Sequence, residues 1–164
     1  VEPLDAMTPS VADLIAELHA RGVVLPPGSV RLDHYGDSAE LSRKLLALIR
    51  SGHKRAGTGL PWWHEHEGEP IPQVGDIEIV LTHDDRPSVI TRVTRVEVLP
   101  YREVSAEYAA IEGEGDGSLD FWRKAHWSYF GRLCTSIGKV PSEEMRVVCG
   151  VFDVLHVLPV DDAA

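Results

Sequence analysis

Two predicted strands that follow each other with only a turn between them constrain the fold of this chain most. The β-branched segment Ile77 to Thr82 is followed by a turn over His83 to Pro87 and by a second strand over Ser88 to Leu99. Consecutive strands without an intervening helix favour an α+β fold over a doubly wound sheet. We predict a small mixed β-barrel with helices packed at its ends.

The second of these strands changes the phase of its side-chain alternation partway along. The alternation runs through Val89, Thr91 and Val93 and then continues, one residue out of phase, at Val96 and Val98. A shift of one residue is typical of a β-bulge, and bulges often bend the strands of barrels. The pattern therefore supports the barrel prediction.

Apolar residues at helical spacing, together with capping signals, predict helices around these strands. Thr8 is the expected N-cap of the first helix, and Asp37 with Glu40 has the spacing of a capping box at the start of the second. The segment His53 to Glu69, which contains several glycines, is predicted as a loop. The predicted helices span Pro9 to Arg21, Asp37 to Gly52, Ser105 to Ile111 and Ser118 to about Gly138, and a strand pair or one long bent strand spans Met145 to Leu158.

Several classes of protein are excluded by what the sequence lacks. No apolar run approaches the roughly 20 residues that a membrane helix needs, and Val1 to Ser10 does not resemble a signal peptide, so we expect a cytoplasmic protein without membrane contacts. Cys134 and Cys149 are expected in the core, because apolar residues, Leu133 and Val148, precede them. Two thiols without paired spacing form neither a disulfide framework nor a zinc site. No nucleophile elbow, P-loop or dinucleotide-binding motif is present, and we expect no cofactor and no metal.

The charge of the chain is unevenly distributed. The formal net charge is −10, yet residues 41 to 64 contain no Asp or Glu. A local basic patch on an acidic body suits a small polar ligand or a short RNA rather than a long duplex, although a solvated helix face followed by a charged turn would have the same composition. The basic residues of this segment are Arg43, Lys44, Arg50, Lys54 and Arg55.

Lys54 lies in a short segment of small residues, Gly52 to Thr58, just beyond a predicted helix. Small residues let the backbone approach a ligand closely. A lysine in a partly dry pocket can act as a base or nucleophile, or hold a phosphate. The C-terminus of a helix also favours a cation, so the charge of Lys54 has a purely structural explanation as well.

An acidic segment follows the predicted short helix, with Glu112, Glu114 and Asp116 alternating with glycines. Alternate carboxylates in an extended chain can hold Mg²⁺. The better-supported interpretation is that Asp116 stabilises the helix N-terminus at Ser118. Glu112 ends an apolar helix, and we hypothesise that it faces inward and pairs with Lys54.

Three aromatic residues have both structural and functional interpretations. His126 lies on the apolar stripe of the longest predicted helix, where it is either a core histidine with satisfied hydrogen bonds or a pocket residue. Trp62 and Trp63 follow the basic segment and either stack on a base or cover the end of the barrel. An exposed Trp62 would also suit a homodimer interface.

Four segments with chemistry-bearing residues occur in a characteristic order. They are Tyr35-Gly36-Asp37-Ser38, Gly52-His53-Lys54-Arg55-Ala56, Trp63 with residues 70 to 76, and residues 109 to 116 followed by Ser118, Trp122 and His126. In this combination they resemble the ASCH family of the PUA-like superfamily, over roughly residues 30 to 158. The acidic segment together with the lysine segment makes the resemblance specific.

The resemblance implies a PUA-type barrel over residues 30 to 160, with residues 1 to 29 as an N-terminal helical extension. It also implies a cleft beside the lysine that takes RNA or a nucleoside, and not DNA. Two activities of relatives are RNA cleavage and hydrolytic removal of the acetyl group from N4-acetylcytidine. In the second, a lysine, a threonine three residues later and a glutamate form the catalytic set; Lys54 and Glu112 match the first and last, whereas Gly57 occupies the threonine position and Thr58 follows it.

We therefore predict a protein that binds RNA or a modified nucleoside, with Lys54 on the floor of the cleft and Glu112 as its partner; these are the two candidate catalytic residues. One alternative is a hydrolase, either a ribonuclease or an enzyme similar to N4-acetylcytidine amidohydrolases. The other is a non-catalytic RNA-binding or regulatory module that keeps the pocket, which Gly57 favours. The candidate ligand-binding residues are Tyr35, Arg55, Thr58, Trp63, Glu114, Asp116 and His126.

Overall fold

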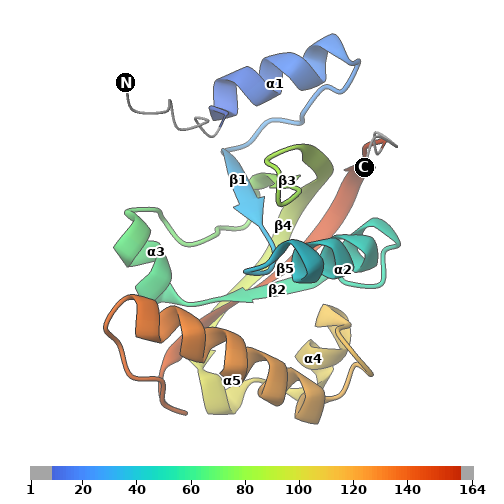
Figure 1. The fold of residues 1–164 in the computed structure, drawn as a ribbon. Helices are drawn as coiled ribbons and strands as arrows, with labels where there is room; N and C mark the ends of the chain where they lie inside the picture. Colours follow the sequence, from blue (N-terminus) through green and yellow to red (C-terminus); the bar gives the residue numbers. More distant parts are fainter. Residues whose placement is uncertain (1–8, 160–164) are drawn as a thin grey trace.

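A five-stranded sheet forms the centre of the fold in the computed structural model, which describes residues 9 to 159 (Figure 1). Neighbouring strands follow the order β1-β3-β4-β5-β2. Strand β1 pairs in parallel with β3, and the other three pairs are antiparallel. The strands are β1 (Val30–His34), β2 (Ala56–Gly59), β3 (Ile77–Leu81), β4 (Pro87–Pro100) and β5 (Arg146–Val157).

The α+β class is confirmed, but the prediction of a barrel is wrong because the sheet is not closed. Closure would require β1 and β2, the two edge strands, to pair with each other, and within the described residues they do not. Residues 31 to 34 of β1 and 57 to 59 of β2 instead line one pocket, described below. The two edge strands therefore form walls of a pocket instead of pairing with each other.

The predicted irregularity in the second strand is present. The register of β4 against β5 shifts between Val93 and Arg95 and again between Ile90 and Thr91. The first of these shifts lies where the side-chain alternation changes phase, which confirms the predicted β-bulge. Strand β5 is one long strand rather than a pair of strands.

Serine side chains cap four of the helices. Ser10, Ser38, Ser105 and Ser118 each accept a hydrogen bond from a backbone N–H of the first turn. The predicted cap Thr8 lies outside the described residues, and the prediction of Asp37 as the first cap of the second helix is wrong by one residue. The helices are α1 (Val11–Ala20), α2 (Ala39–Arg50), α3 (Pro61–Glu67), α4 (Ala106–Glu112) and α5 (Leu119–Ser136), with a 3₁₀ turn η1 (Tyr101–Glu103).

The prediction of a loop over His53 to Glu69 is wrong, because this segment contains β2 and α3. Strand β2 has two glycines among its four residues and no alternating apolar pattern. It is a strand because it pairs with β5, where Thr58 lies opposite Cys149. Strand β1 was not predicted either; it is formed by parallel pairing with β3, a contact between segments far apart in the sequence.

The helices cover both faces and one end of the sheet (Figure 1). Leu14 of α1 packs in one cluster with Ile79 of β3, and Ile49 of α2 packs in another with Val80. Because neighbouring side chains of a strand point to opposite faces, α1 and α2 lie on opposite sides of β3. Helices α4 and α5 form a third cluster around Trp122.

Two further expectations concern the described part of the chain. Cys134 and Cys149 are buried and unpaired with each other, as predicted. Among the described helices, none combines the length and apolarity needed to cross a membrane.

Candidate functional site

One pocket of about 410 Å³ lies between the open edge of the sheet and the helices. Its lining comes from both edge strands, from β3 and β5, and from helices α2, α3, α4 and α5. Seven of the nine residues predicted for the site line it: Tyr35, Lys54, Thr58, Trp63, Glu112, Glu114 and His126.

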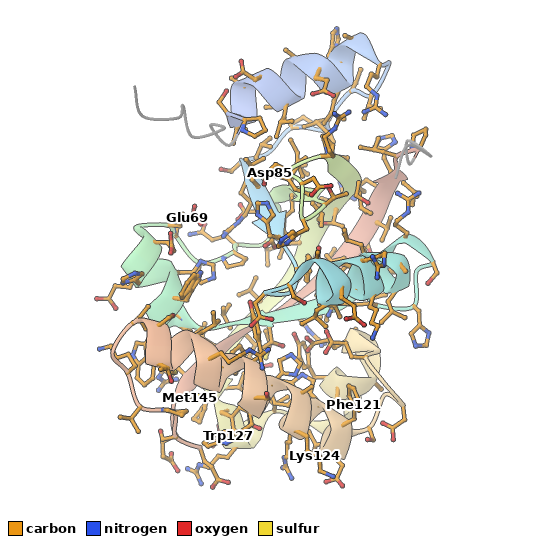
Figure 2. All side chains as sticks on the ribbon, viewed as in Figure 1. Glu69, Asp85, Phe121, Lys124, Trp127 and Met145 are labelled. Carbon is orange, nitrogen blue, oxygen red and sulfur yellow. The ribbon has the colours of Figure 1, made fainter. Side chains whose placement is uncertain are left out.

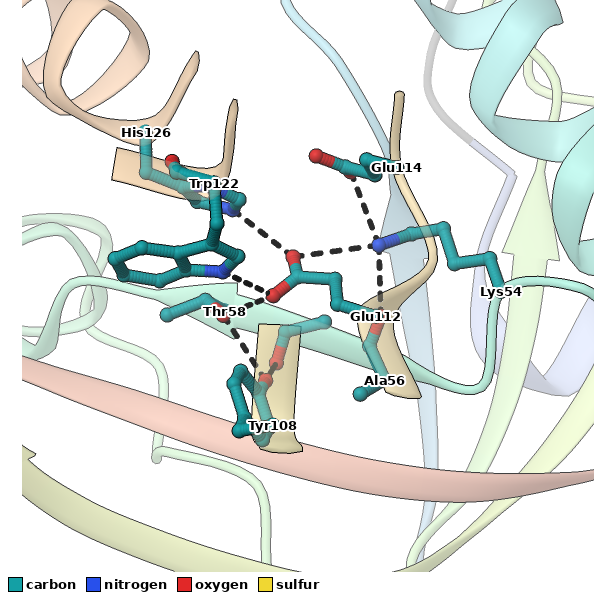
Figure 3. A network of polar contacts seen from close by, with 9 residues as sticks. Lys54, Ala56, Thr58, Tyr108, Glu112, Glu114, Trp122 and His126 are labelled. Atoms are coloured by element: carbon teal, nitrogen blue, oxygen red, sulfur yellow. Dashed lines mark hydrogen bonds and ion pairs between the residues drawn. The ribbon is translucent and has the colours of Figure 1, made fainter. Parts of the chain in front are cut away.

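Glu112 is the centre of a hydrogen-bond network in the pocket wall (Figure 3). Its Oε1 lies 3.3 Å from Lys54 Nζ and 2.9 Å from His126 Nε2. Its Oε2 accepts hydrogen bonds from Thr58 Oγ1 at 2.7 Å and from Trp122 Nε1 at 2.6 Å. A carboxylate has about four acceptor positions, so these donors occupy all of them. The hypothesised pairing of Lys54 with Glu112 is thus present in the structure.

Lys54 is equally well partnered, although its side chain is only 1% exposed. Its Nζ donates to the carbonyl oxygen of Ala56 at 2.7 Å and lies 3.3 Å from Glu112 Oε1 and 3.1 Å from Glu114 Oε1. An ammonium group has three N–H donors, and each has an acceptor here. Of the three acceptors, Glu114 is the carboxylate at the rim, with 14% of its side chain exposed.

Opposite charges set the protonation states in this cluster. Burial disfavours the charged form of Glu112, but Lys54 and His126 outweigh it and hold the pKa of Glu112 well below its ordinary value. Burial likewise disfavours a charged His126, yet the charge and hydrogen bond of Glu112 raise the pKa of His126. The geometry therefore favours an ionised Glu112 beside cationic partners.

Local backbone geometry brings the lysine segment and the acidic segment together. Gly113 ends α4 in the left-handed region, with φ of 67°, and a Cβ there would lie 2.5 Å from the carbonyl oxygen of His53. The backbone N–H of Arg55 donates to the carbonyl oxygen of Ile111 at 3.0 Å. A glycine is needed at position 113 for the two segments to approach this closely.

Gly57 and Thr58 face different neighbours from adjacent positions of β2. A Cβ on Gly57 would lie 2.9 Å from Cε1 of Tyr35, so the tyrosine ring occupies the space that a side chain at 57 would need. Thr58 lies on the side of Glu112 and Tyr108, whose hydroxyl is 2.9 Å from Thr58 Oγ1. Thr58 therefore donates to Glu112 from its own position in β2, and its side chain does not need to occupy the space beside Gly57.

Two predicted site residues lie outside the pocket lining. Arg55 pairs with Asp153 on the surface, at 2.8 Å. Asp116 is exposed and accepts a hydrogen bond from the backbone N–H of Ser118, next to the start of α5. This is the structural interpretation that the sequence offered for Asp116.

The residues of the site that were not predicted from the sequence are Tyr108, Trp122, Asp33 and Glu78. Tyr108 and Glu112 are four residues apart on α4, and Trp122 and His126 are four residues apart on α5, so each pair lies on one helix face. The rings of Trp122 and His126 stack at 4.2 Å. The spacing of four residues within each pair is visible in the sequence and could have predicted that the two members share a helix face. Asp33 and Glu78 also line the pocket, but strand β1 had to be known to place them together.

Glu112, Glu114 and His126 have ligand atoms within 4.8 Å of one another, a spacing compatible with a metal ion. The Lys54 ammonium lies within 3.3 Å of both carboxylates. It supplies the positive charge that a cation would bring, so we assign no metal to this cluster.

Comparisons with known proteins agree with this architecture. The ASCH domain family model matches residues 31 to 156. A crystal structure of an ASCH domain from Lactobacillus crispatus JV V101 is 34% identical with a TM-score of 0.75, covering 86% of this chain and 91% of that one. Protein EF3133 from Enterococcus faecalis V583 is 28% identical with a TM-score of 0.73, covering 88% and 86%. A search of curated proteins finds no match. The family match spans most of the described fold, and the chain belongs to the ASCH domain family.

Proposed function

We propose that this protein binds a modified nucleoside, free or within a short single-stranded RNA, in the pocket beside Lys54. The observation that carries the proposal is the buried Lys54–Glu112 pair in the wall of a pocket of about 410 Å³. Burying charged groups costs desolvation free energy, and buried charged pairs of this kind are common in binding and catalytic sites. ASCH domains are generally RNA-binding, which supports the same ligand class.

The size, lining and charge of the pocket support a nucleoside. Its volume falls in the range of about 300 to 1,000 Å³ that is typical of small-molecule sites. Tyr35, Trp63 and Tyr129 contribute aromatic rings to its lining, and aromatic rings stack on bases irrespective of base identity. The net charge of −10 disfavours a long polyanion.

A ligand in this pocket engages Lys54 by replacing one of its acceptors. The Ala56 carbonyl belongs to β2, and Glu112 is held by three further donors. Glu114 is the more exposed carboxylate, so it is the partner that exchanges. Lys54 then donates a hydrogen bond to a ligand oxygen, while Glu112 keeps the lysine in place.

A second candidate function is hydrolysis, of RNA or of the acetyl amide of N4-acetylcytidine. The observation that favours it is that Lys54 Nζ and Thr58 Oγ1 both contact the carboxylate of Glu112. In this reaction Lys54 would stabilise the negative charge that develops on a carbonyl or phosphoryl oxygen. With its pKa lowered, Glu112 is a weak base, so its part would be to position Thr58 and Lys54 rather than to remove a proton at neutral pH.

One set of assays separates the two functions. Purified wild-type protein, Lys54→Arg and Lys54→Ala are incubated with N4-acetylcytidine and with a short single-stranded RNA, and both binding and turnover are measured. Lys44→Ala is the matched control, because Lys44 is an exposed lysine paired with Glu40 on α2. We expect wild type and Lys44→Ala to bind, Lys54→Ala to lose binding, and Lys54→Arg to retain part of it.

The outcomes discriminate between the candidates. Binding without turnover leaves the binding function and removes the hydrolase. Turnover that Lys54→Ala does not change would contradict the site assignment. Failure of the wild-type protein to bind either probe would contradict the proposal as a whole. Circular dichroism shows whether a variant that loses binding is still folded.

A further inference from the structure

A second group of polar side chains, one of them buried and one half-buried, lines the same pocket. Asp33 of β1 and Glu78 of β3 both line the pocket, and Glu78 is 3% exposed. Neither contributes to the hydrogen bonds around Glu112. The proposed chemistry of Lys54 therefore does not account for them.

The sheet register explains why these two carboxyl groups meet. Parallel pairing places Arg31 opposite Glu78, with Asp33 two residues further along β1 on the same face. On the other side of β3, Thr91 lies opposite Glu78 and its hydroxyl donates to Glu78 Oε1 at 3.3 Å. The side chains of Asp33 and Glu78 are close enough to form a hydrogen bond with each other.

A hydrogen bond between two carboxyl groups needs a proton, because two carboxylates have only acceptors. Burial and the neighbouring charge of Asp33 raise the pKa of Glu78 well above its ordinary value, which supplies that proton. Arg31 opposes this effect, but its NH1 donates to the Pro70 carbonyl at 3.1 Å and lies 3.8 Å from Asp76. Glu78 is therefore the carboxyl group that holds the proton of this hydrogen bond most readily.

The groups around the pair point to a ligand at this end of the pocket. The other titratable groups that line the pocket here are Arg31 and His34 of β1, Tyr35 just after it, His64 of α3, and Glu69 just after α3 (Figure 2). Arg31 Nε and His64 Nδ1 are buried and have no hydrogen-bond partner among the described residues. A buried polar atom without a partner is costly, and a bound ligand would supply one.

We propose that the Asp33–Glu78 pair is a subsite that recognises the uncharged hydrogen-bonding edge of a nucleobase. The pair presents carboxyl oxygens that accept from an amino or imino group of a pyrimidine, and the unpartnered Arg31 Nε–H, which lines the same pocket, is a donor for a neighbouring carbonyl. This inference rests on the proposed function and assigns the opposite end of the same ligand.

The first test measures ligand binding to the full chain. Isothermal titration calorimetry compares cytidine, N4-acetylcytidine and cytidine 5′-monophosphate over a range of about pH 5 to 9. We expect all three to bind, and the monophosphate no more weakly than the nucleosides, because the pair faces the base and not the phosphate. We also expect affinity to fall as pH rises, since deprotonation of Glu78 breaks its hydrogen bond to Asp33 and leaves two carboxylates that repel each other in the subsite.

Two variants of Glu78 separate recognition from packing. Glu78→Gln keeps a neutral donor and is expected to bind nucleosides with a flatter pH profile than wild type. Glu78→Leu removes the donor without leaving a buried charge and is expected to weaken binding by about tenfold or more. His126 titrates in both wild type and Glu78→Gln, so the difference between the two profiles isolates Glu78. Glu67→Gln, an exposed carboxyl on α3, is the control.

The second test needs no ligand. The carboxyl carbon of Glu78, followed by ¹³C NMR, is expected to titrate above the ordinary glutamate range in wild type and at lower pH in Asp33→Asn. Titration in the ordinary range, unchanged by Asp33→Asn, would overturn the shared proton. Unchanged nucleoside affinity in Glu78→Leu would overturn the subsite and leave the proposed function standing, whereas no nucleoside binding by wild type overturns both.

Discussion

Glu112 and Glu78 are similarly buried carboxyl groups in one pocket, and their surroundings shift their pKa values in opposite directions. They are 1% and 3% exposed. Burial alone disfavours the ionised form of both. Around Glu112, Lys54 and His126 reverse that effect and lower the pKa, whereas around Glu78 the charge of Asp33 adds to it and raises the pKa.

The contrast shows that the depth of a carboxyl group does not determine its protonation state. The neighbours decide, since an opposite charge favours ionisation and a like charge disfavours it. The pocket therefore has one carboxyl group whose pKa is lowered beside a lysine and another whose pKa is raised beside a second carboxyl group.

The largest expected effect follows from removing the carboxylate of the Lys54 cluster. Glu112→Ala leaves Lys54, His126, Thr58 and Trp122 without their shared acceptor, and we expect the free energy of unfolding to fall by about 3 to 5 kcal/mol. Urea denaturation measures it. Glu67→Ala, which removes an exposed glutamate, is the control and is expected to change it by less than about 0.5 kcal/mol. Equal effects of the two substitutions would contradict the network.

A smaller effect is expected from removing one donor of that network. Thr58→Val keeps the shape of the side chain but loses the hydrogen bond to Glu112 Oε2, and we expect a loss of about 1.5 to 3 kcal/mol in unfolding free energy. Thr94→Val is the matched control, because Thr94 donates to the Val151 carbonyl from an exposed position. A loss at Thr58 no larger than that at Thr94 would show that the contact contributes little.

The two carboxyl groups are also expected to give stability opposite dependences on pH. The stabilising contribution of Glu78 is full below the ordinary carboxyl pKa and is lost as pH rises through its raised value. That of Glu112 is present above the ordinary pKa and is lost as pH falls through its lowered value. One proton gives at most about 1.4 kcal/mol per pH unit.

Denaturation of Glu78→Gln and Glu112→Gln at several pH values, each compared with wild type, tests this contrast. We expect Glu78→Gln to gain stability relative to wild type as pH rises. We expect the deficit of Glu112→Gln to shrink as pH falls. If the stability difference from wild type changed with pH in the same direction for both variants, the electrostatic account of the pocket would be contradicted.

The smallest effect is expected at Asp116, two residues beyond Glu114. Asp116→Asn keeps an acceptor for the Ser118 N–H and loses only a charge near the start of α5, so we expect a change of about 0.5 kcal/mol or less. Nucleoside affinity, measured by calorimetry, is expected to stay at the wild-type value, whereas Glu114→Gln is expected to alter it. A loss of affinity in Asp116→Asn would place Asp116 in the binding site after all.

Elements with strong local signals were predicted from the sequence. Helix α5 has a serine cap at Ser118 and an apolar stripe that includes Trp122 and His126, and both features act within a few residues. The β3–β4 pair and the bulge in β4 follow from side-chain alternation. In the site, the position of Glu112 at the end of an apolar helix was enough to suggest that it faces inward and pairs with Lys54.

Local patterns determine which segments of this chain are helical and where several helices begin, because capping and amphipathic spacing need only nearby residues. Tertiary pairing decided that residues 30 to 34 and 56 to 59 are strands and that the sheet stays open. It also decided which carboxyl group meets a lysine and which meets another carboxyl group. The strength of an electrostatic interaction depends on distance in space and not on distance along the sequence. For that reason the opposite pKa shifts of Glu112 and Glu78 follow only from the folded structure.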